Sequence, residues 1–200
     1  ARDPFLAMLF DRDIKRRGAR FDSLTEGAVY IGDTYLASLN DKQLTELRRK
    51  AVGFVFQAYN LIPTLTAREN IMLPLMLGGE SGDTTWIQHV IDTVGLGDRM
   101  LHRPSELSGG QQQRVAVARA LASRPTIIFA DEPTGNLDSN AGHEILEFMR
   151  NAVDEFGQTI VMVTHDRRAA DKAHAIKYLE KGELSDSEDV AERSVQAPRH

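Results

Sequence analysis

Residues 126–133 read TIIFADEP, a short apolar run that ends in two adjacent carboxylates, Asp131 and Glu132. Apolar runs of this length, rich in β-branched residues and closed by a turn residue, are typical of buried strands. Ligands of open α/β sheets bind at the carboxyl ends of the strands, where Asp131 and Glu132 would lie. An acidic junction between a strand and a loop has the same sequence, so this stretch alone leaves both interpretations open.

Three further runs of the same kind indicate strands, and longer stretches with helical period lie between them. The predicted strands are residues 28–31, 52–56, 126–130 and 159–164, and the clearest helices are residues 110–122 and 141–156. Strands that alternate with helices of about 10–15 residues predict a parallel sheet covered by helices. The predicted fold class is therefore α/β.

The middle of the chain differs from the rest because it has no strand candidate. Residues 66–107 keep a helical pattern that is broken only by GGESG at 78–82. We interpret residues 60–107 as a helical insertion in the α/β core. The helix that follows, residues 110–122, would place four apolar side chains on one buried stripe: Val115, Ala118, Leu121 and Ala122.

The composition is that of an ordinary globular protein and excludes several classes. The 200 residues carry 24 basic and 29 acidic side chains, and the net charge of −5 gives no electrostatic reason to expect nucleic-acid binding. A chain of this length buries a core without disulfides or metals, in agreement with the absence of cysteine. The longest apolar stretch, Ile71–Leu77, contains Pro74 and is far shorter than the roughly 20 residues that span a bilayer. The opening residues, ARDP, do not resemble a signal peptide.

The sequence LSGGQ at 107–111 stands directly before the predicted helix at 110–122. Ser108 is a natural N-cap, and Gly109 and Gly110 allow a ligand to approach the backbone. The N–H groups and the positive dipole end of a helix start form a site suited to an anion. An ordinary capped helix would begin with the same residues.

Three further residues follow predicted strands or turns, and each has an ordinary explanation of its own. His165 follows the strand at 159–164, where a histidine is more often structural than catalytic. Gln57 follows the strand at 52–56, where a surface glutamine is the default. Asp138 belongs to GNLD at 135–138, which a turn explains completely.

The order and spacing of these pieces resemble the nucleotide-binding domain of ATP-binding-cassette (ABC) transporters, from Asp22 to Leu184. Gln57 matches the Q-loop, LSGGQ at 107–111 the signature motif, IIFAD at 127–131 the Walker B strand, Glu132 the catalytic glutamate, Asp138 the D-loop and His165 the switch histidine. TGNLDS at 134–139 and FVFQAYNLIP at 54–63 are similar to the macrolide-export, lipoprotein-release and cell-division subfamily.

The resemblance implies a P-loop NTPase-like sheet that binds ATP and Mg²⁺. Phosphoryl transfer depends mostly on positioning and charge stabilisation. Asp131 would hold Mg²⁺ directly or through water, and Gln57 would sense the metal and the γ-phosphate. Glu132 would orient and polarise the attacking water, and His165 would bond to the γ-phosphate.

The resemblance also implies two protein partners at the cytoplasmic, inner face of a membrane. Ser108, Gly109, Gly110 and Gln111 would face the nucleotide held by a second nucleotide-binding domain, and Asp138 would communicate across that interface. The insertion, especially residues 60–70, would dock a transmembrane permease subunit. The transported substrate and the direction of transport depend on that subunit and are not encoded in this chain.

The family's first phosphate-binding element, the Walker A loop G-x-x-x-x-G-K-[ST], has no counterpart in the sequence. Family spacing places its end at about residues 5–13, which read FLAMLFDRD without glycine, lysine or hydroxyl. Lys15 or Arg16 would supply charge but not the nest of backbone N–H groups that holds phosphate. We therefore expect an atypical segment at 1–21, an ABC ATPase domain at 22–184 and a polar, mobile tail at 185–200, with poor ATP binding in the chain's own site.

Three origins of the atypical segment stay open: a misread frame or wrong start, a truncated relic, or a degenerate regulatory subunit. The first is favoured because the resemblance begins abruptly near Phe21 and then stays intact. Two other functions also stay open. A DNA-repair or chromosome-maintenance ATPase shares this motif logic but carries long heptad or zinc-bearing insertions, and a non-catalytic partner subunit is supported by the missing loop alone.

Overall fold

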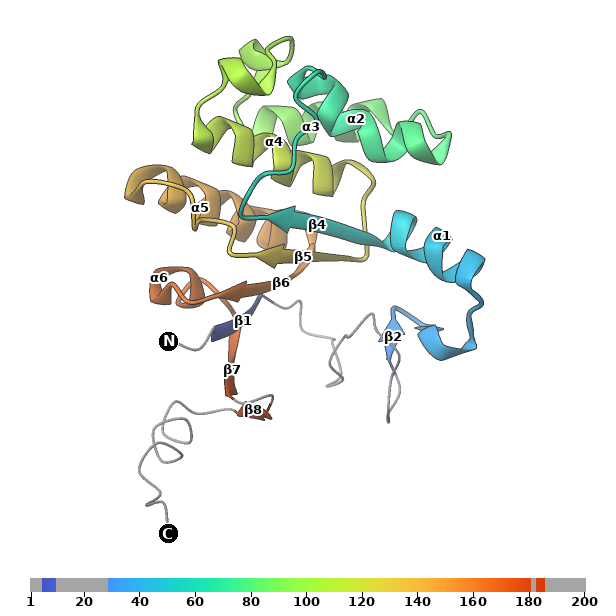
Figure 1. The fold of residues 1–200 in the computed structure, drawn as a ribbon. Helices are drawn as coiled ribbons and strands as arrows, with labels where there is room; N and C mark the ends of the chain where they lie inside the picture. Colours follow the sequence, from blue (N-terminus) through green and yellow to red (C-terminus); the bar gives the residue numbers. More distant parts are fainter. Residues whose placement is uncertain (1–4, 10–28, 181–182, 186–200) are drawn as a thin grey trace.

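A computed structural model describes residues 5–9, 29–180 and 183–185 of the chain, and its centre is a six-stranded sheet (Figure 1). The strand order is β4-β5-β6-β1-β7-β8. The strands are β4 (Val52–Phe56), β5 (Ile127–Asp131), β6 (Thr159–Thr164), β1 (Phe5–Leu9), β7 (Ala175–Glu180) and β8 (Glu183–Ser185). The sheet is mixed, because β4, β5 and β6 are parallel while β1, β7 and β8 pair antiparallel.

The register of the three parallel strands brings their carboxyl ends to one edge. Asp131, the last residue of β5, pairs with Phe56 of β4 on one side and with Val163 of β6 on the other. The residues that follow these strands are Gln57, Glu132 and His165. Three of the residues singled out in the sequence therefore lie at the same edge of the sheet, beside Asp131.

Strand β1 runs in the opposite direction to β6. Phe5 pairs with Thr164, at the edge where β6 ends, and Leu9 pairs with Ile160, near the edge where β6 begins. The end of β1 from which the chain continues therefore lies at the edge opposite Glu132 and His165.

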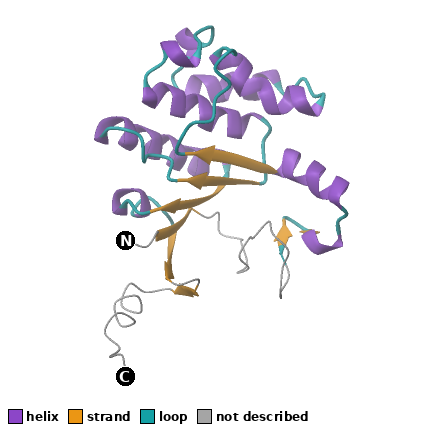
Figure 2. Ribbon diagram, viewed as in Figure 1, coloured by secondary structure: helices purple, strands orange, loops and turns teal. Residues whose placement is uncertain are grey.

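Helices cover the sheet and are concentrated next to β4 (Figure 2). They are α1 (Asp41–Ala51), α2 (Ala67–Gly78), α3 (Thr84–Thr93), α4 (Gly109–Ala122), α5 (Ser139–Phe156) and α6 (Arg167–Ala170), with 3-10 turns at Leu36–Ser38, Gly97–Arg99 and Pro104–Glu106. Side-chain caps fix most of the helix starts, as Asn40, Thr66, Asp83, Ser108 and Asp138 each accept a hydrogen bond from a backbone N–H of the first turn.

Helix α4 is the centre of the main hydrophobic core. It packs against α2, α3, α5 and β4, so it is buried on more than one side. The predicted stripe is confirmed but too narrow, because the structure also buries four further residues of this helix: Gln113, Ala116, Val117 and Ala120. The helix approaches β4 closely because Gly53 has no side chain; a Cβ there would lie 2.9 Å from the carbonyl oxygen of Ala120.

Most of the predicted elements are confirmed, with one exception. The strands at 52–56 and 159–164, the strand ending at Asp131 and the helices at 110–122 and 141–156 are present, and described residues 66–107 contain no strand. Of the strand predicted at 28–31, Tyr30–Ile31 forms strand β2, which pairs with Thr34–Tyr35 (β3) in a separate hairpin and does not join the main sheet. Residue 28 lies outside the described residues. Gly32, at φ +56°, allows the tight turn that folds this segment back on itself.

Several sequence-based expectations fall partly outside the described residues. The predicted tail at 185–200 is described only at Ser185, and of the segment at 1–21 only β1 is described. Within the described part of the chain, every helix is too short or too polar to cross a bilayer.

Candidate functional site

Glu132 is held rigidly at the carboxyl edge of the sheet by residues of β6 and of the loop after it. Its backbone N–H donates to the carbonyl oxygen of Val163 (2.9 Å), and its φ of +44° places it in the left-handed region. Its Oε1 accepts from the backbone N–H of His165 (2.9 Å), and its Oε2 accepts from the hydroxyl of Thr164 (3.1 Å). Both carboxylate oxygens are thus oriented, and the side chain is only 16% exposed.

The imidazole of His165 is the third contact of this carboxylate. Its Nδ1 lies 2.6 Å from Oε1 of Glu132, and the side chain is 57% exposed. An ionised carboxylate only accepts hydrogen bonds, so this contact requires the proton on Nδ1. Nε2 is then the ring nitrogen that is not engaged by Glu132.

Gln57 is tied to the loop that follows Glu132. Its Nε2 donates to Oδ1 of Asn136 (3.1 Å), and Nδ2 of Asn136 donates back to the carbonyl oxygen of Gln57 (3.0 Å). Gly135 leaves room for this pair, because a Cβ there would lie 2.6 Å from Gln57 Nε2. The N–H of Gly135 donates to the carbonyl oxygen of Glu132 (3.0 Å), so the loops carrying Gln57 and Glu132 form one connected structure.

Asp131 stands between these groups as an exposed carboxylate at the end of β5. The described residues contain no group of three or more His, Cys, Asp or Glu side chains that could hold a metal by themselves. A metal at this edge would therefore rely on Asp131, with water and ligand oxygens completing its shell.

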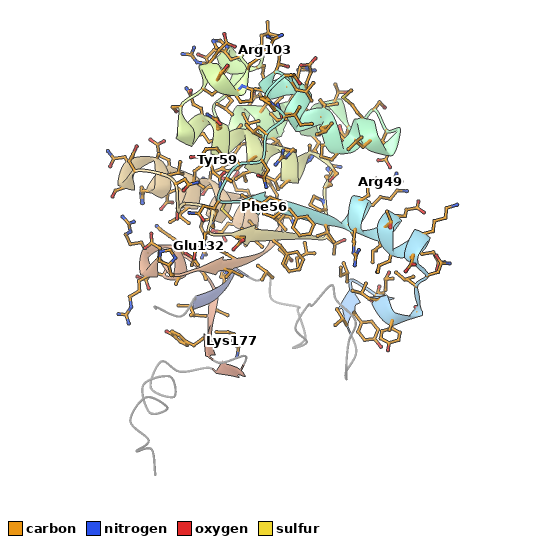
Figure 3. All side chains as sticks on the ribbon, in the orientation of Figure 1. Arg49, Phe56, Tyr59, Arg103, Glu132 and Lys177 are labelled. Atoms are coloured by element: carbon orange, nitrogen blue, oxygen red, sulfur yellow. The ribbon has the colours of Figure 1, made fainter. Side chains whose placement is uncertain are left out.

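The LSGGQ residues form a separate group at the start of α4. The hydroxyl of Ser108 accepts from the N–H of Gln111 (3.3 Å), and Oε1 of Gln111 accepts from the N–H of Ser108 (2.9 Å). The neighbours of the two glycines are Tyr59, Leu137 and Ala141, whereas those of Glu132 come from β6 and His165. In Figure 3, Tyr59 lies near α4 and Glu132 near α6. The start of α4 therefore borders the loops of Tyr59 and Leu137, while Glu132 is held by β6 and His165.

Asp138 caps helix α5. Its carboxylate accepts from the N–H groups of Asn140 and Ala141, each at 2.9 Å. Ala141 also packs beside Gly110, where a Cβ would lie 3.1 Å from that of Ala141. Asp138 thereby fixes the start of α5 next to the start of α4.

The comparisons with known proteins agree with this geometry. The sequence model described as ABC transporter matches residues 19–135. The chain belongs to the ABC transporter family. An uncharacterized ABC transporter ATP-binding protein of Thermotoga maritima is 46% identical over 165 residues, which cover 82% of this chain and 70% of that protein. The macrolide export ATP-binding/permease protein MacB of Brucella melitensis is 40% identical over 88% of this chain, but only 27% of its own length is covered.

Solved structures of the family share the fold. The dimeric structure of MJ0796, a protein of Methanocaldococcus jannaschii, is 44% identical and matches with a TM-score of 0.70, over 82% of this chain and 73% of the other. A dimeric post-hydrolysis state of the same cassette, bound to ADP and Pi, matches with a TM-score of 0.69. The α/β fold of an ABC cassette is thereby confirmed.

Four residues of this ABC chain that support the site were not predicted from the sequence. Thr164 and Asn136 hold Glu132 and Gln57 as described above. Gln113 and Arg119 reach the same loops from α4. Nε2 of Gln113 donates to the carbonyl oxygen of Pro133 (2.6 Å). The guanidinium of Arg119 donates to the carbonyl oxygen of Tyr59 (3.0 Å). One signal was available for Gln113, because a polar residue on the buried side of an apolar helix needs a partner.

Burial shifts two pKa values where α4 meets the loop after β4. Desolvation raises the pKa of the Tyr59 hydroxyl and lowers that of the Arg119 guanidinium. In both cases burial disfavours the charged form.

Proposed function

We propose that this chain is an ATP-hydrolysing subunit of an ABC transporter, with its catalytic edge at Asp131, Glu132 and His165. The observation that carries the proposal is the fixed carboxylate of Glu132, held by Thr164 and His165 directly after a buried parallel strand. A base that is oriented before the substrate arrives loses little entropy in the reaction. Glu132 accepts a proton from the attacking water, and His165, with a proton on each ring nitrogen, donates from Nε2 to the terminal phosphate.

The residues at this edge fit a magnesium ion. Mg²⁺ keeps several waters and is bound through one or two carboxylates together with substrate phosphates. Asp131 offers one exposed carboxylate, and Oε1 of Gln57 is not used in the pairing with Asn136. When bound, the ion neutralises charge on the phosphates. Asp131 holds it, and Gln57 links its position to the loop after β4.

The direction of β1 does not fit a phosphate-binding loop placed after that strand. A phosphate loop follows a parallel strand and opens at its carboxyl end, the edge where Glu132 and His165 lie. Strand β1 is antiparallel to β6 and ends at Leu9, beside Ile160 at the other edge. We therefore propose that the chain binds ATP poorly in its own site. The direction of β1 also supports a second role, in which this chain presents α4 to the ATP bound by another subunit.

The start of α4 supports a paired arrangement of two cassettes. Ser108 and Gln111 satisfy each other, which leaves the N–H groups of Gly109 and Gly110 pointing out of a 14-residue helix. Such a helix end is suited to the phosphate of a nucleotide on a second subunit. The structural relatives are dimeric, and the name of MacB joins an ATP-binding part to a permease. We propose the same partners here, with residues 60–70 docking the permease at the inner face of the membrane.

The test compares the chain with a version whose residues 1–21 are replaced by a family strand and G-x-x-x-x-G-K-[ST] loop. Calorimetric titration with Mg-ATP should show binding by the replaced version and little by the original chain. In the replaced version, Glu132→Gln should keep binding and lose turnover by about 10²–10⁴-fold, the usual contribution of a general base. Glu155→Gln, at an exposed position of α5, is the matched control.

Two results would count against the proposal. Tight ATP binding by the original chain would disprove the defect in its own site. Normal turnover by Glu132→Gln in the replaced version would disprove the assignment of the base.

A further inference from the structure

A single buried glutamine on α4 connects the two loops that carry Gln57 and Glu132. The side chain of Gln113 is completely buried. Its Nε2 donates to the carbonyl oxygen of Phe56 (3.3 Å) and to that of Pro133 (2.6 Å). Phe56 directly precedes Gln57, and Pro133 directly follows Glu132. One amide nitrogen therefore holds both chain segments next to the residues proposed to act on the nucleotide.

The pairing of β4 with β5 does not hold these two segments together. The last paired residues are Phe56 of β4 and Asp131 of β5, so the ladder between the strands ends before Gln57 and Glu132. Glu132 is also in the left-handed region, at φ +44°, which is costly for a residue with a side chain. A conformation of this kind persists only where its surroundings hold it. The bond from Gln113 to Pro133, one residue away, is such a restraint.

The carbonyl oxygen of the Gln113 amide indicates which half of the group matters. Oε1 is buried and has no hydrogen-bond partner among the described residues. A buried acceptor without a partner is destabilising, and an apolar side chain of the same size would avoid that cost. The stabilising part of the amide is therefore its donor nitrogen, which contacts both loops.

We propose that Gln113 is a positioning residue that sets the spacing between Gln57 and Glu132. The proposal rests on the function given above, in which these two side chains serve one nucleotide. It assigns Gln113 a role beyond packing: it acts through the backbone of Phe56 and Pro133 on the groups beside them. Loss of its donor should let the two loops move apart while the sheet and α4 persist.

The chain contains a matched control for this role. Gln158 is also buried (7% exposed), and its Nε2 likewise donates to two carbonyl oxygens, those of Pro125 and Thr159, both at 3.1 Å. These carbonyls lie at the beginnings of β5 and β6, at the edge opposite Glu132. Gln158 thus has the same chemistry in the same sheet, without a predicted site residue beside it.

The experiment compares Gln113→Met with Gln158→Met in the full chain by NMR. Methionine keeps the length of the side chain and removes both donated bonds. Both variants should lower the denaturation midpoint. Only Gln113→Met should shift the side-chain amide signals of Gln57 and the imidazole ¹⁵N signals of His165. The amide signals of Gln57 report its bond to Asn136, and the imidazole signals of His165 report its contact with Glu132.

A shorter amide keeps the proposal testable if Gln113→Met does not fold. Gln113→Asn retains the donor but is one methylene shorter, so it cannot reach both carbonyls and should shift the signals of one loop only. The proposal is overturned if Gln57 and His165 keep their signals in the folded variants, or if Gln158→Met moves them equally. No readout involves ATP, so this result and that of the turnover test on Glu132 are independent.

Discussion

Arg119 holds two consecutive residues in a strained conformation, and its removal gives the sharpest stability prediction. Its Nη1 donates to the carbonyl oxygen of Asn60 (2.6 Å), and its Nη2 donates to that of Tyr59 (3.0 Å). Tyr59 has a φ of 60° and Asn60 a φ of 49°, both in the left-handed region. The guanidinium therefore keeps the loop after Gln57 in a shape that its own backbone disfavours.

The magnitude for Arg119→Met follows from the loss of these bonds and the release of strain. Two hydrogen bonds from a charged donor contribute about 3–6 kcal/mol in total. If the loop relaxes, two left-handed residues recover about 2–4 kcal/mol. The net loss of unfolding free energy is then about 1–2 kcal/mol, which at a slope near 2 kcal/mol per M shifts the urea midpoint by about 0.5–1 M.

The assay combines urea unfolding with amide hydrogen exchange. In Arg119→Met, protection should fall at Tyr59, whose N–H donates to the carbonyl of Phe56 (3.2 Å), and at Ile62, whose N–H donates to Asn70 (2.8 Å). Arg114→Met is the control on the same helix. Arg114 bonds to the carbonyl of Val94, which has an ordinary φ of −75°, so exchange in the loop after Gln57 should not change.

A double-mutant cycle separates strain from simple bond loss. Asn60→Gly should stabilise the wild-type chain, since glycine adopts a positive φ without cost, but not the Arg119→Met variant, in which the strain is already released. The expected coupling is about 1–2 kcal/mol. Additive effects of the two substitutions, or an unchanged urea midpoint with unchanged protection of the loop, would refute the reasoning.

The remaining predictions concern two glycines and one carboxylate. Gly53→Ala should cost about 1–3 kcal/mol of stability in urea unfolding, because the new Cβ would lie 2.9 Å from the backbone carbonyl oxygen of Ala120 and 3.0 Å from Cγ1 of the buried Ile128. Gly135→Ala should leave the unfolding midpoint nearly unchanged but displace the Gln57 side chain, as read from its NMR amide signals. The hydrogen bond from Arg168 lowers the pKa of Asp166 below its ordinary value of 3.8, so its stabilising contribution is complete above that value and is lost as the pH falls through the folded pKa. Arg168→Leu should therefore flatten the acid limb of the stability profile.

Each of these predictions has a result that contradicts it. Gly97→Ala is the control for Gly53→Ala, since a Cβ at Gly97 meets nothing within 4 Å; equal losses in the two variants would contradict the packing argument. Unchanged Gln57 signals in Gly135→Ala would show that the loop yields instead of the side chain. An acid limb that is the same in Arg168→Leu and in the wild type would remove Asp166 as its cause.

The sequence was sufficient for the elements whose signals are local. The strands at 52–56 and 159–164 are apolar runs, the first at the edge of the sheet and the second in its interior, and the start of α4 follows from Ser108 and Gln111, which cap each other. The strand predicted at 28–31 is present at Tyr30–Ile31 but not in the main sheet, because β-branched residues favour an extended backbone without choosing its partner. There Gly32 turns the chain back onto Tyr35 instead.

The supporting residues of the site could not be predicted because their partners are distant in sequence. Gln113 bonds to the carbonyls of Phe56 and Pro133, which are 57 and 20 positions away. Every residue has a backbone carbonyl, so the sequence does not indicate which carbonyl a buried side-chain amide will bond to. The direction of β1 is equally nonlocal, since it is defined only by its pairing with β6 and β7.

Helix α4 connects the two groups of site residues, and this connection has a mechanical consequence. Ser108 caps its start, while Gln113 and Arg119 attach the same helix to the loops that carry Glu132 and Gln57. At 1.5 Å per residue these attachments lie about 7 and 16 Å along the axis from the cap, a distance over which one helix is stiff. A displacement of the start of α4 by a nucleotide on a second subunit should therefore reach Gln57 and Glu132 through the helix itself. Under the paired arrangement proposed above, this chain would then sense the occupancy of its partner's site through α4.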